Sequence, residues 1–278
     1  MPLNVDELVA IDIHTHAEEP CKHGETRDDG YMEFQAGMAK YFGNPAGADG
    51  MLPSPGQTAA YFRERKIGAV IFPVDTERET GFHRYSNEEV AEICAENDDI
   101  LIPFASIDPW KGKMAAREAR RLIRDFGVRG FKFHPTMQGF WPNDRMAYPF
   151  YEVLEEEGTR CNVTLVFNQT QGLAAAEAGA TLISPFVGRI FDWHRKQSMN
   201  IATPDDDPGV QSVRQIYRTF KARGLETIVM GASFRNASQI QALAGCDKLT
   251  ISPALLGELA ADTGSLTRVL DAELVAPE

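Results

Sequence analysis

The chain has 278 residues, of which 43% are hydrophobic and 24% are charged, as expected of a soluble protein that buries a sizeable core. Its formal net charge of −12 argues against nucleic acids and anionic membranes as partners. No apolar run approaches the roughly 20 residues of a membrane span, and the first residues lack the features of a signal peptide, so we expect a cytoplasmic protein. The 4 cysteines lie far apart in the sequence, which predicts reduced thiols rather than disulfides or a zinc ribbon.

Short apolar runs alternate with helical patterns along the chain, which is typical of parallel βα units. Eight strands are expected, at residues 8–13, 69–74, 101–107, 128–133, 163–167, 181–184, 227–230 and 248–251. Helical patterns lie between them, for example at 86–97, 113–126, 170–178, 210–223 and 238–244. Nearly continuous apolar strands fit a sheet that is buried on both faces, so we predict an α/β fold that closes as a (β/α)8 TIM barrel. An open doubly wound sheet is the alternative, but no G-x-G-x-x-G follows the first strand.

Two stretches depart from this regular alternation. Residues 17–55 have little helix or strand character and many Gly, Pro and acidic residues, which predicts a functional lid or a mobile loop. After the eighth expected strand only residues 254–262 have a helical pattern. The final helix of the barrel is therefore expected to be short or missing.

The first expected strand ends in polar residues that share one face. Asp12, His14 and His16 are spaced two apart, and residues at that spacing in a strand point to the same side. Two imidazoles placed in this way can both bind one divalent metal ion such as zinc. The alternative is that these polar residues at a strand end are only hydrogen-bonded to the following loop.

Residues 5–157 resemble the amidohydrolase-related family that includes aminocarboxymuconate-semialdehyde decarboxylase. The resemblance is carried by the segments IDIHTH (11–16), FPVD (72–75), FASIDP (104–109) and GFKFHPTMQGFWPND (130–144). It implies a metal-dependent TIM barrel in which His14 and His16 bind zinc or a similar ion. Further ligands in that family are a histidine ending strand five and an aspartate ending strand eight. Here Asn168 occupies the position of the histidine that ends strand five, and no acid ends strand eight, so the metal site is incomplete.

Two arginines follow strands six and seven of the expected barrel. Arg189 and Arg235 each begin a loop at the carboxyl end of a strand, and these loops meet at the same rim. Two guanidiniums placed there form a fork-shaped receptor for phosphate oxygens. The alternative is that both arginines pair with nearby surface acids.

Residues 158–264 resemble the second half of a transaldolase. The segments that carry the resemblance are CNVTLVF (161–167), AAAEAGATLISPFVGRIFDW (174–193), DPGVQSVRQIY (207–217), TIVMGASFRN (227–236) and AGCDKLTISPALL (244–256). The resemblance implies that the sugar-phosphate site is lined by Ser184, Arg189, Ser233 and Arg235. It also implies that Asn162 and Thr164 line the reacting centre.

Transaldolases carry a Schiff-base lysine on strand four, and Lys132 occupies that strand here. Thr136, Gln138 and Gly139 follow it at the family's spacing, and Asp12 stands where the family has an acid on strand one. A buried lysine has a lowered pKa and can attack a carbonyl carbon. The family's glutamate on strand three has no match, Ser106 being nearest, and losing one general acid–base group costs about 10²–10⁴-fold in rate. The alternative role of Lys132 is a rim cation paired with acids such as Asp12.

Three hypotheses follow for the whole chain. The favoured one is a single barrel domain built from two half-barrels of different ancestry, 1–157 and 158–278, which keeps a sugar-phosphate pocket but has little activity. The second is Schiff-base chemistry of the transaldolase or aldolase type on ketose phosphates. The third is a metal-dependent amidohydrolase or decarboxylase. No cofactor follows firmly from the sequence, a single divalent metal such as zinc being the one candidate. A phosphorylated small molecule is the expected partner, and a homodimer over the seam between strands eight and one is expected because closure there is weak.

Overall fold

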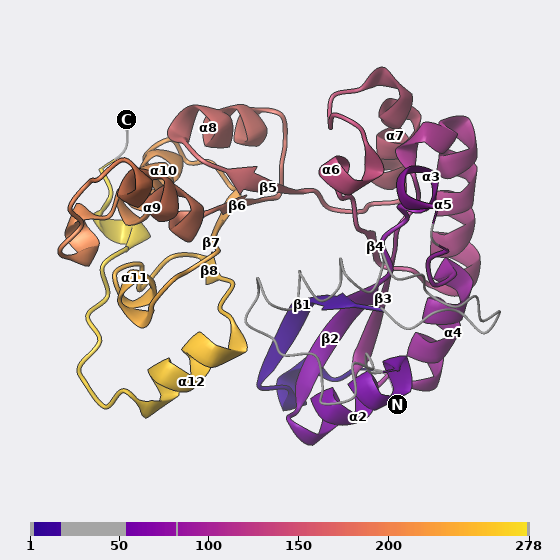
Figure 1. Cartoon of the computed structure of the whole chain (residues 1–278), viewed down its shortest axis with the longest axis horizontal. Helices are drawn as coiled ribbons and strands as arrows, with labels where there is room; N and C mark the ends of the chain where they lie inside the picture. Colours follow the sequence, from indigo (N-terminus) through magenta and orange to yellow (C-terminus); the bar gives the residue numbers. More distant parts are fainter. Residues whose placement is uncertain (1–2, 18–53, 82, 277–278) are drawn as a thin grey trace. The chain divides into compact units, whose positions relative to one another are not determined.

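The computed structural model describes residues 3–17, 54–81 and 83–276, and the chain divides into two compact units. Unit 1 is Met1–Thr159 and unit 2 is Arg160–Glu278. Figure 1 labels the helices and strands of both. Most of the segment at 17–55, which the sequence predicts to be a lid or a mobile loop, lies outside the described residues.

Unit 1 contains four parallel strands in the order β1-β2-β3-β4. The strands are β1 (Ala10–His16), β2 (Ile67–Phe72), β3 (Leu101–Ala105) and β4 (Gly130–Phe131). The α-helices are α2 (Pro55–Glu64), α3 (Glu77–Thr80), α4 (Asn87–Glu96), α5 (Lys113–Phe126), α6 (Pro135–Gln138) and α7 (Tyr148–Glu156). Short 3-10 helices are η1 (Val5–Glu7), η2 (Pro109–Lys111) and η3 (Arg145–Ala147).

Unit 2 repeats this arrangement with the strand order β5-β6-β7-β8, again parallel. The strands are β5 (Asn162–Val166), β6 (Leu182–Pro185), β7 (Ile228–Gly231) and β8 (Lys248–Leu249). The α-helices are α8 (Gln169–Glu177), α9 (Val187–Lys196), α10 (Pro208–Ala222), α11 (Ala237–Gln241) and α12 (Pro253–Ala261). The 3-10 helices are η4 (Pro204–Asp206) and η5 (Ala272–Leu274).

Several helices begin where the sequence places a capping residue. Ser54 starts α2 with a reciprocal capping box, in which its Oγ accepts from the backbone of Gln57 and the Gln57 side chain accepts from the backbone of Ser54. Ser86 caps α4, because its Oγ accepts from the backbone N–H of Glu89 at 3.1 Å. Asp207 caps α10 directly before Pro208, which suits the first turn of a helix.

Each unit has its own hydrophobic core. In unit 2, Val213, Ile216 and Phe220 of α10 pack with Ile183 of β6 and Val229 of β7. The spacing of the three α10 residues places them on one helix face, and burying each contributes about 1.5–3 kcal/mol. Unit 1 has two such clusters of buried side chains. One is formed mainly by residues of β3, α5 and α7, and the other mainly by residues of α2, β2 and α4.

The predicted α/β class with parallel strands is confirmed, and each unit has the architecture of a half-barrel. A doubly wound sheet would reverse its strand order at a switch point. Each of the two sheets keeps the sequential order, which the halves of a doubly wound sheet and the halves of a barrel share, so the doubly wound alternative stays open. Closure of all eight strands into one barrel stays a prediction. Among the described residues, no helix is both long and apolar enough to cross a bilayer.

Some predicted boundaries need correction. The strand expected at 128–133 is reduced to the two residues of β4, and the one expected at 248–251 is reduced to β8. The strand expected at 8–13 instead continues to His16 in β1. After β8 comes α12, a helix of 9 residues, which agrees with the short final helix predicted from the sequence.

Candidate functional site

His14 and His16 converge at the carboxyl end of β1. Their Nε2 atoms lie 3.1 Å apart, and both rings contact the ring of Phe72 from β2. With zinc–nitrogen bonds of about 2.0–2.1 Å, that separation would give an N–Zn–N angle of roughly 95–100°, close to tetrahedral. The same separation also suits a single N–H···N hydrogen bond between the rings.

The surroundings of this pair keep both imidazoles neutral. Burial, followed by the charges of Lys132 and His134, lowers the pKa of His14 to about 4. Burial, followed by the charges of His14, Lys132 and His134, lowers the pKa of His16 to about 3. His16 is the more enclosed of the two, so the effect of burial is stronger there. Neutral imidazoles can bind a metal ion through a ring nitrogen.

Asp12 is turned back to its own strand. Its Oδ1 accepts a hydrogen bond of 2.8 Å from the backbone N–H of His14. The pairing of β1 with β2 shifts register between Asp12 and Thr15, so the strict alternation expected along this strand is interrupted there. Asp12 therefore supports the bend that carries the two histidines.

Lys132 follows β4 and lies half-buried in unit 1. Its Nζ is 5.7 Å from the centre of the Phe72 ring, the same ring that the two histidines contact. Burial lowers the pKa of the Lys132 amine. Asp12, the carboxylate expected to pair with Lys132, accepts a hydrogen bond from the backbone N–H of His14, and the rim-cation role of Lys132 stays a prediction.

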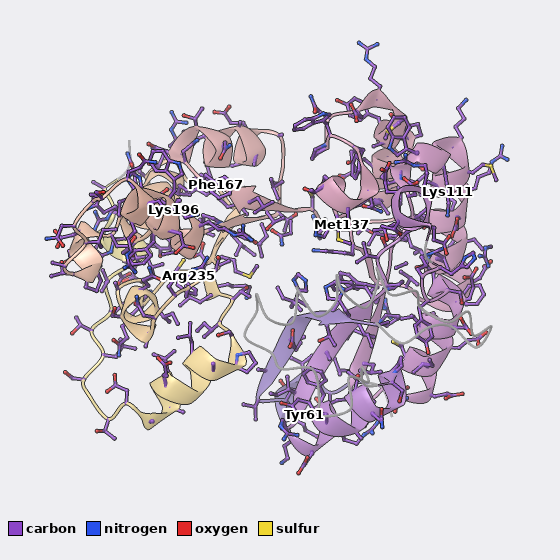
Figure 2. The ribbon with its side chains drawn as sticks, viewed as in Figure 1. Tyr61, Lys111, Met137, Phe167, Lys196 and Arg235 are labelled. Carbon is purple, nitrogen blue, oxygen red and sulfur yellow. The ribbon has the colours of Figure 1, made fainter. Side chains whose placement is uncertain are left out.

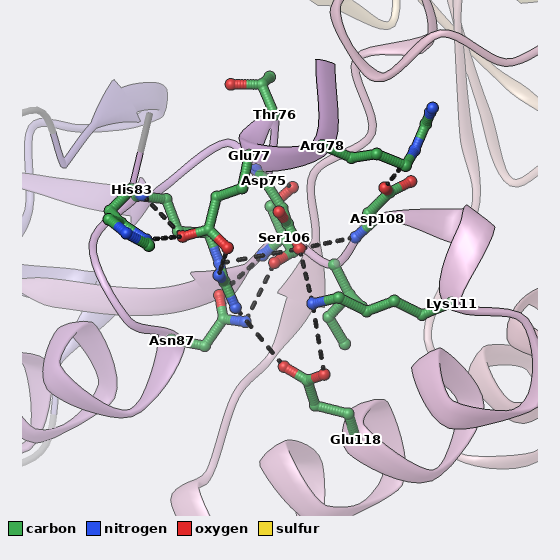
Figure 3. Close-up of polar contacts among 12 residues, drawn as sticks. Asp75, Thr76, Glu77, Arg78, His83, Asn87, Ser106, Asp108, Lys111 and Glu118 are labelled. Atoms are coloured by element: carbon green, nitrogen blue, oxygen red, sulfur yellow. Dashed lines mark hydrogen bonds and ion pairs between the residues drawn. The ribbon is translucent and has the colours of Figure 1, made fainter. Parts of the chain in front are cut away.

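Ser106, the residue nearest to the place of the missing glutamate, is fully buried and holds backbone groups together. Its Oγ accepts from the backbone N–H of Asp75 at 3.0 Å and donates to the carbonyl of Lys132 at 2.8 Å. The Asn87 side chain bonds both backbone groups of Ser106 at 3.0 Å (Figure 3). Ser106 is therefore a structural residue and supplies no acid to Lys132.

A charged network surrounds Asp75 at the loop after β2 (Figure 3). Asp75 is buried, and its Oδ2 accepts from the backbone of Asp108 at 2.8 Å and from Lys111 Nζ at 3.0 Å. The guanidinium of Arg84 lies 3.8 Å from the same oxygen. A shallow cavity of about 280 Å³ opens beside this network, lined by Asp75, Glu77, Arg78, Asp108, Trp110 and Lys111. Each cation here is already paired with carboxylates, so the network holds together the loops that follow β2 and β3.

Gln138 ties the end of β4 to the loops after β2 and β3. Its Oε1 accepts from the backbone of His134 at 2.7 Å, and its Nε2 donates to the carbonyls of Asp75 and Ile107 at 3.2 and 3.4 Å. Nδ1 of His134 accepts from the backbone of Met137, which makes His134 a hydrogen-bonded rim residue.

In unit 2, Asn162 and Thr164, which are expected at the reacting centre, both lie on β5, and Ser184 of the expected sugar-phosphate site lies on the neighbouring β6. Ser184 of β6 donates to Oδ1 of Asn162 of β5 at 3.0 Å. Thr164 is paired with Ser184 in the ladder and is exposed. The register shifts just after Thr164, where Leu165 has a φ of +58°.

Arg235 is held on two sides at the loop after β7 (its place is labelled in Figure 2). Its Nε and Nη2 donate to Oδ2 of Asp192 of α9 at 3.0 and 2.7 Å. Its Nη1 donates to the carbonyl and Oγ of Ser233, both at 3.3 Å. The predicted pairing of an arginine with a nearby acid is thus present for Arg235. Arg189 is exposed in the first turn of α9, three residues before Asp192 and so on the same helix face.

Close backbone packing supports this loop. The N–H of Gly188 donates to the carbonyl of Ser233 at 2.7 Å, and a Cβ at position 188 would lie 2.1 Å from that oxygen. Ser233 has a φ of +63°, a conformation that L residues rarely adopt and that the surrounding contacts must hold in place.

The predicted residues thus gather in two groups. In unit 1, His14, His16 and Lys132 surround Phe72. In unit 2, Asn162 bonds Ser184, and Ser233 bonds Arg235. The sequence interpretation missed Asp192, whose only local signal is its position one helical turn after Arg189. It also missed Gln239, although this residue stands near a helix start where a glutamine can bond back to the chain.

Known proteins resemble the C-terminal part of this chain. Residues 142–275 match the family model described as transaldolase/fructose-6-phosphate aldolase. A transaldolase of Allorhizobium ampelinum (strain S4) is 52% identical over 164 residues, which are 58% of this chain and 50% of that protein. A transaldolase of Methylobacillus flagellatus is 59% identical over 154 residues, which are 55% of this chain and 48% of that protein. The chain therefore spans about half the length of the curated relatives that it matches.

A solved structure gives a much more distant match. It is a 5-carboxyvanillate decarboxylase of Novosphingobium aromaticivorans complexed with manganese, with a TM-score of 0.39 and 11% identity, over 83% of this chain and 65% of that chain. Similarity at this level establishes neither a shared fold nor a shared function. The identity to transaldolases is far higher, and the match to the transaldolase/fructose-6-phosphate aldolase family covers the C-terminal part of this chain.

Proposed function

We propose that this chain binds phosphorylated sugars through unit 2 and forms an imine through Lys132 of unit 1, as a transaldolase-type aldolase of low turnover. The observation that carries the proposal is the held guanidinium of Arg235 beside Ser233, at the carboxyl end of β7 in a domain of the transaldolase family. Loops at that end of a barrel strand commonly bind phosphate.

The phosphate-binding role rests on the chemistry of the arginine. Asp192 contacts the Nε and Nη2 edge of Arg235, and Nη1 donates to Ser233 and to the carbonyl of Phe234. The second N–H of Nη2 is left for a charge-assisted hydrogen bond to a phosphate oxygen. The hydroxyl of Ser233 lies within hydrogen-bond distance of Nη1 and can donate to the same phosphate group. Arg189 supplies a second positive charge from α9.

The imine-forming role rests on the burial of Lys132, which lowers the pKa of its amine. The neutral amine attacks the carbonyl carbon of a ketose, and the carbinolamine loses water to leave an imine. Loss of water needs a proton donor. The neighbours of Lys132 among the described residues include His14, His16 and His134, whose pKa values are all lowered by burial. They are neutral near pH 7 and donate protons poorly, so turnover is reduced by roughly 10²–10⁴-fold.

We also propose that residues 1–157 and 158–278 descend from two barrel families. Two observations support this, namely the division of the chain into compact units after Thr159 and the transaldolase match to residues 142–275. The match begins before residue 158, so the helix α7 lies in the segment where the two ancestries would meet. A hybrid of this kind would keep the phosphate-binding half of one enzyme without its full acid–base machinery.

Calorimetric titration with fructose 6-phosphate and with inorganic phosphate tests the binding role. Arg235→Ala should weaken both by about 10- to 100-fold, because charge-assisted hydrogen bonds contribute roughly 1.5–3 kcal/mol. Arg218→Ala is the matched control, since Arg218 is an exposed arginine of α10 in the same unit. The Arg218→Ala protein should bind both ligands with the affinity of the wild type. Equal affinities of the wild-type and Arg235→Ala proteins would refute the binding role.

A metal-dependent hydrolase or decarboxylase is the second candidate, favoured by the 3.1 Å between the Nε2 atoms of His14 and His16. A catalytic zinc site needs about three protein ligands. The described residues hold no group of three histidine, cysteine or acidic side chains that fits an ion, so this set does not complete such a site. Elemental analysis of the purified protein is the test. About one equivalent of zinc or manganese, lost in His14→Ala, would support the candidate, and a metal-free protein would end it.

A further inference from the structure

We propose that Asp192 is a specificity-determining residue of the phosphate site in unit 2, which positions Arg235 and makes the site select singly phosphorylated ligands over diphosphates. The inference rests on the phosphate-binding role proposed above. It starts from the Asp192–Arg235 ion pair, whose Nη2–Oδ2 distance is 2.7 Å.

The ion pair fixes the orientation of the guanidinium. One oxygen of Asp192 accepts from both Nε and Nη2 of Arg235, and Ser233 accepts from Nη1. A free arginine side chain loses rotamer entropy when it is immobilised. Because Asp192 and Ser233 have already immobilised Arg235, a ligand that binds the remaining N–H of Nη2 avoids much of that cost.

The backbone of the loop is fixed independently of Asp192. Oε1 of Gln239 accepts from the backbone N–H of Arg235 at 2.8 Å, and Nε2 of Gln239 donates to Oδ2 of Asp207 at 2.6 Å. Gly188 of α9 bonds the carbonyl of Ser233 at 2.7 Å. Removing Asp192 therefore releases the Arg235 side chain without releasing the loop that carries it.

The ion pair also sets the charge that a ligand meets. The Asp192 carboxylate offsets the positive charge of the Arg235 guanidinium with which it pairs. Asp192 and Arg235 are 42% and 32% exposed, so solvent screens this effect only in part. A ligand with one phosphate group binds Arg235, whereas the Asp192 carboxylate repels the added negative charge of a second phosphate group. Asparagine at position 192 would keep an oxygen acceptor for Arg235 and remove the repulsion.

The experiment titrates inorganic phosphate and inorganic pyrophosphate into five proteins by calorimetry. These are the wild type, Asp192→Asn, Asp192→Ala, Asp205→Asn and Arg235→Ala. Asp205→Asn is a matched control, because Asp205 forms an arginine pair of similar length, 2.6 Å, with Arg214 in the same unit. Thermal unfolding of each protein shows that the loop and its unit stay folded.

Asp192→Asn should bind phosphate roughly 3- to 10-fold more tightly than the wild type and gain more for pyrophosphate. Its affinity should also fall more steeply with added salt. Asp192→Ala should bind more weakly than Asp192→Asn, because the side chain of Arg235 is no longer held. Asp205→Asn should match the wild type for both probes.

The outcomes separate this inference from the proposed function. If Arg235→Ala weakens phosphate binding but Asp192→Asn leaves the ratio of the two affinities unchanged, the role of Asp192 is wrong and the phosphate site stands. If Asp192→Ala binds as tightly as Asp192→Asn, the positioning role is wrong. If Arg235→Ala binds phosphate as the wild type does, both the site and this inference fail.

Discussion

Gln239 and Asp207 form a hydrogen bond of 2.6 Å between Nε2 and Oδ2, and both side chains are 1% exposed. The other end of the Gln239 amide accepts the backbone N–H of Arg235. The other oxygen of Asp207 accepts from Gly209 at the start of α10. One buried amide therefore joins the loop that carries Arg235 to the N-terminus of the longest helix of unit 2 among the described residues.

Gln239→Leu should lower the free energy of unfolding of unit 2 by about 2–4 kcal/mol. The substitution leaves the buried Asp207 carboxylate without one of its partners and the N–H of Arg235 without an acceptor, and unpaired buried groups are costly. Urea denaturation followed by circular dichroism measures the change. Gln215→Leu on the exposed face of α10 is the control. An equal effect of the two substitutions would contradict the stabilising role of the hydrogen bonds that Gln239 makes to Arg235 and Asp207.

Ser106→Glu, which restores the acid that a transaldolase has on strand three, should not raise activity. Ser106 is fully buried, and its hydroxyl joins Asp75 to Lys132 through their backbones. A glutamate there would bury a charge without a partner and break both hydrogen bonds. Ser106→Ala, which breaks only the bonds, should cost about 1–3 kcal/mol. Thermal unfolding ranks the two variants, and a Ser106→Glu protein that is both stable and more active than the wild type would show that the site can accept the acid.

The strand ends were predictable because their signal is local. Spacing of two along β1 places His14 and His16 together, and the positions of Lys132 and Arg235 after their strands indicate which residues reach the rim. The contacts that complete each group depend on packing between distant segments. Asp192 reaches Arg235 across 43 residues only because α9 approaches the loop after β7 at Gly188. No pattern around Asp192 encodes that approach.

Three glutamines show the same limit of prediction from sequence. Gln138, Gln171 and Gln239 each accept a hydrogen bond from the backbone N–H four residues earlier, at 2.7, 2.8 and 2.8 Å. That repetition can be read from sequence as a helix-start pattern. The second partner of each amide cannot be read from sequence. Gln239 bonds Asp207, the N-cap of α10, whereas Gln138 bonds the carbonyls of Asp75 and Ile107 in the loops after β2 and β3. Buried amides select these partners through tertiary structure.

Lys132 should form an imine at a lower pH than an exposed lysine. Burial lowers the pKa of its amine from the ordinary value of 10.5, and only the neutral amine is nucleophilic. The trapped fraction should therefore rise with pH and reach half its maximum below the ordinary lysine pKa. Borohydride reduction in the presence of fructose 6-phosphate, followed by peptide mass mapping, measures this at each pH. Lys132→Arg is the control and should carry no adduct at position 132, while wild-type protein without an adduct on Lys132 would end the imine proposal.

Gly188→Ala should destabilise unit 2 and weaken phosphate binding together. A Cβ at this position would lie 2.1 Å from the carbonyl oxygen of Ser233, which is backbone and cannot rotate away. The loop that carries Ser233 and Arg235 must then shift, at a cost of about 1–3 kcal/mol or more. Gly257→Ala in α12 is the matched control, because nothing lies within 4 Å of its added Cβ, and it should stabilise the helix by up to about 1 kcal/mol. Urea denaturation and phosphate titration of both variants measure the difference. If Gly188→Ala were as stable as Gly257→Ala, the loop after β7 would not depend on its contact with α9. The backbone of that loop at Arg235 would then be held by Gln239 alone.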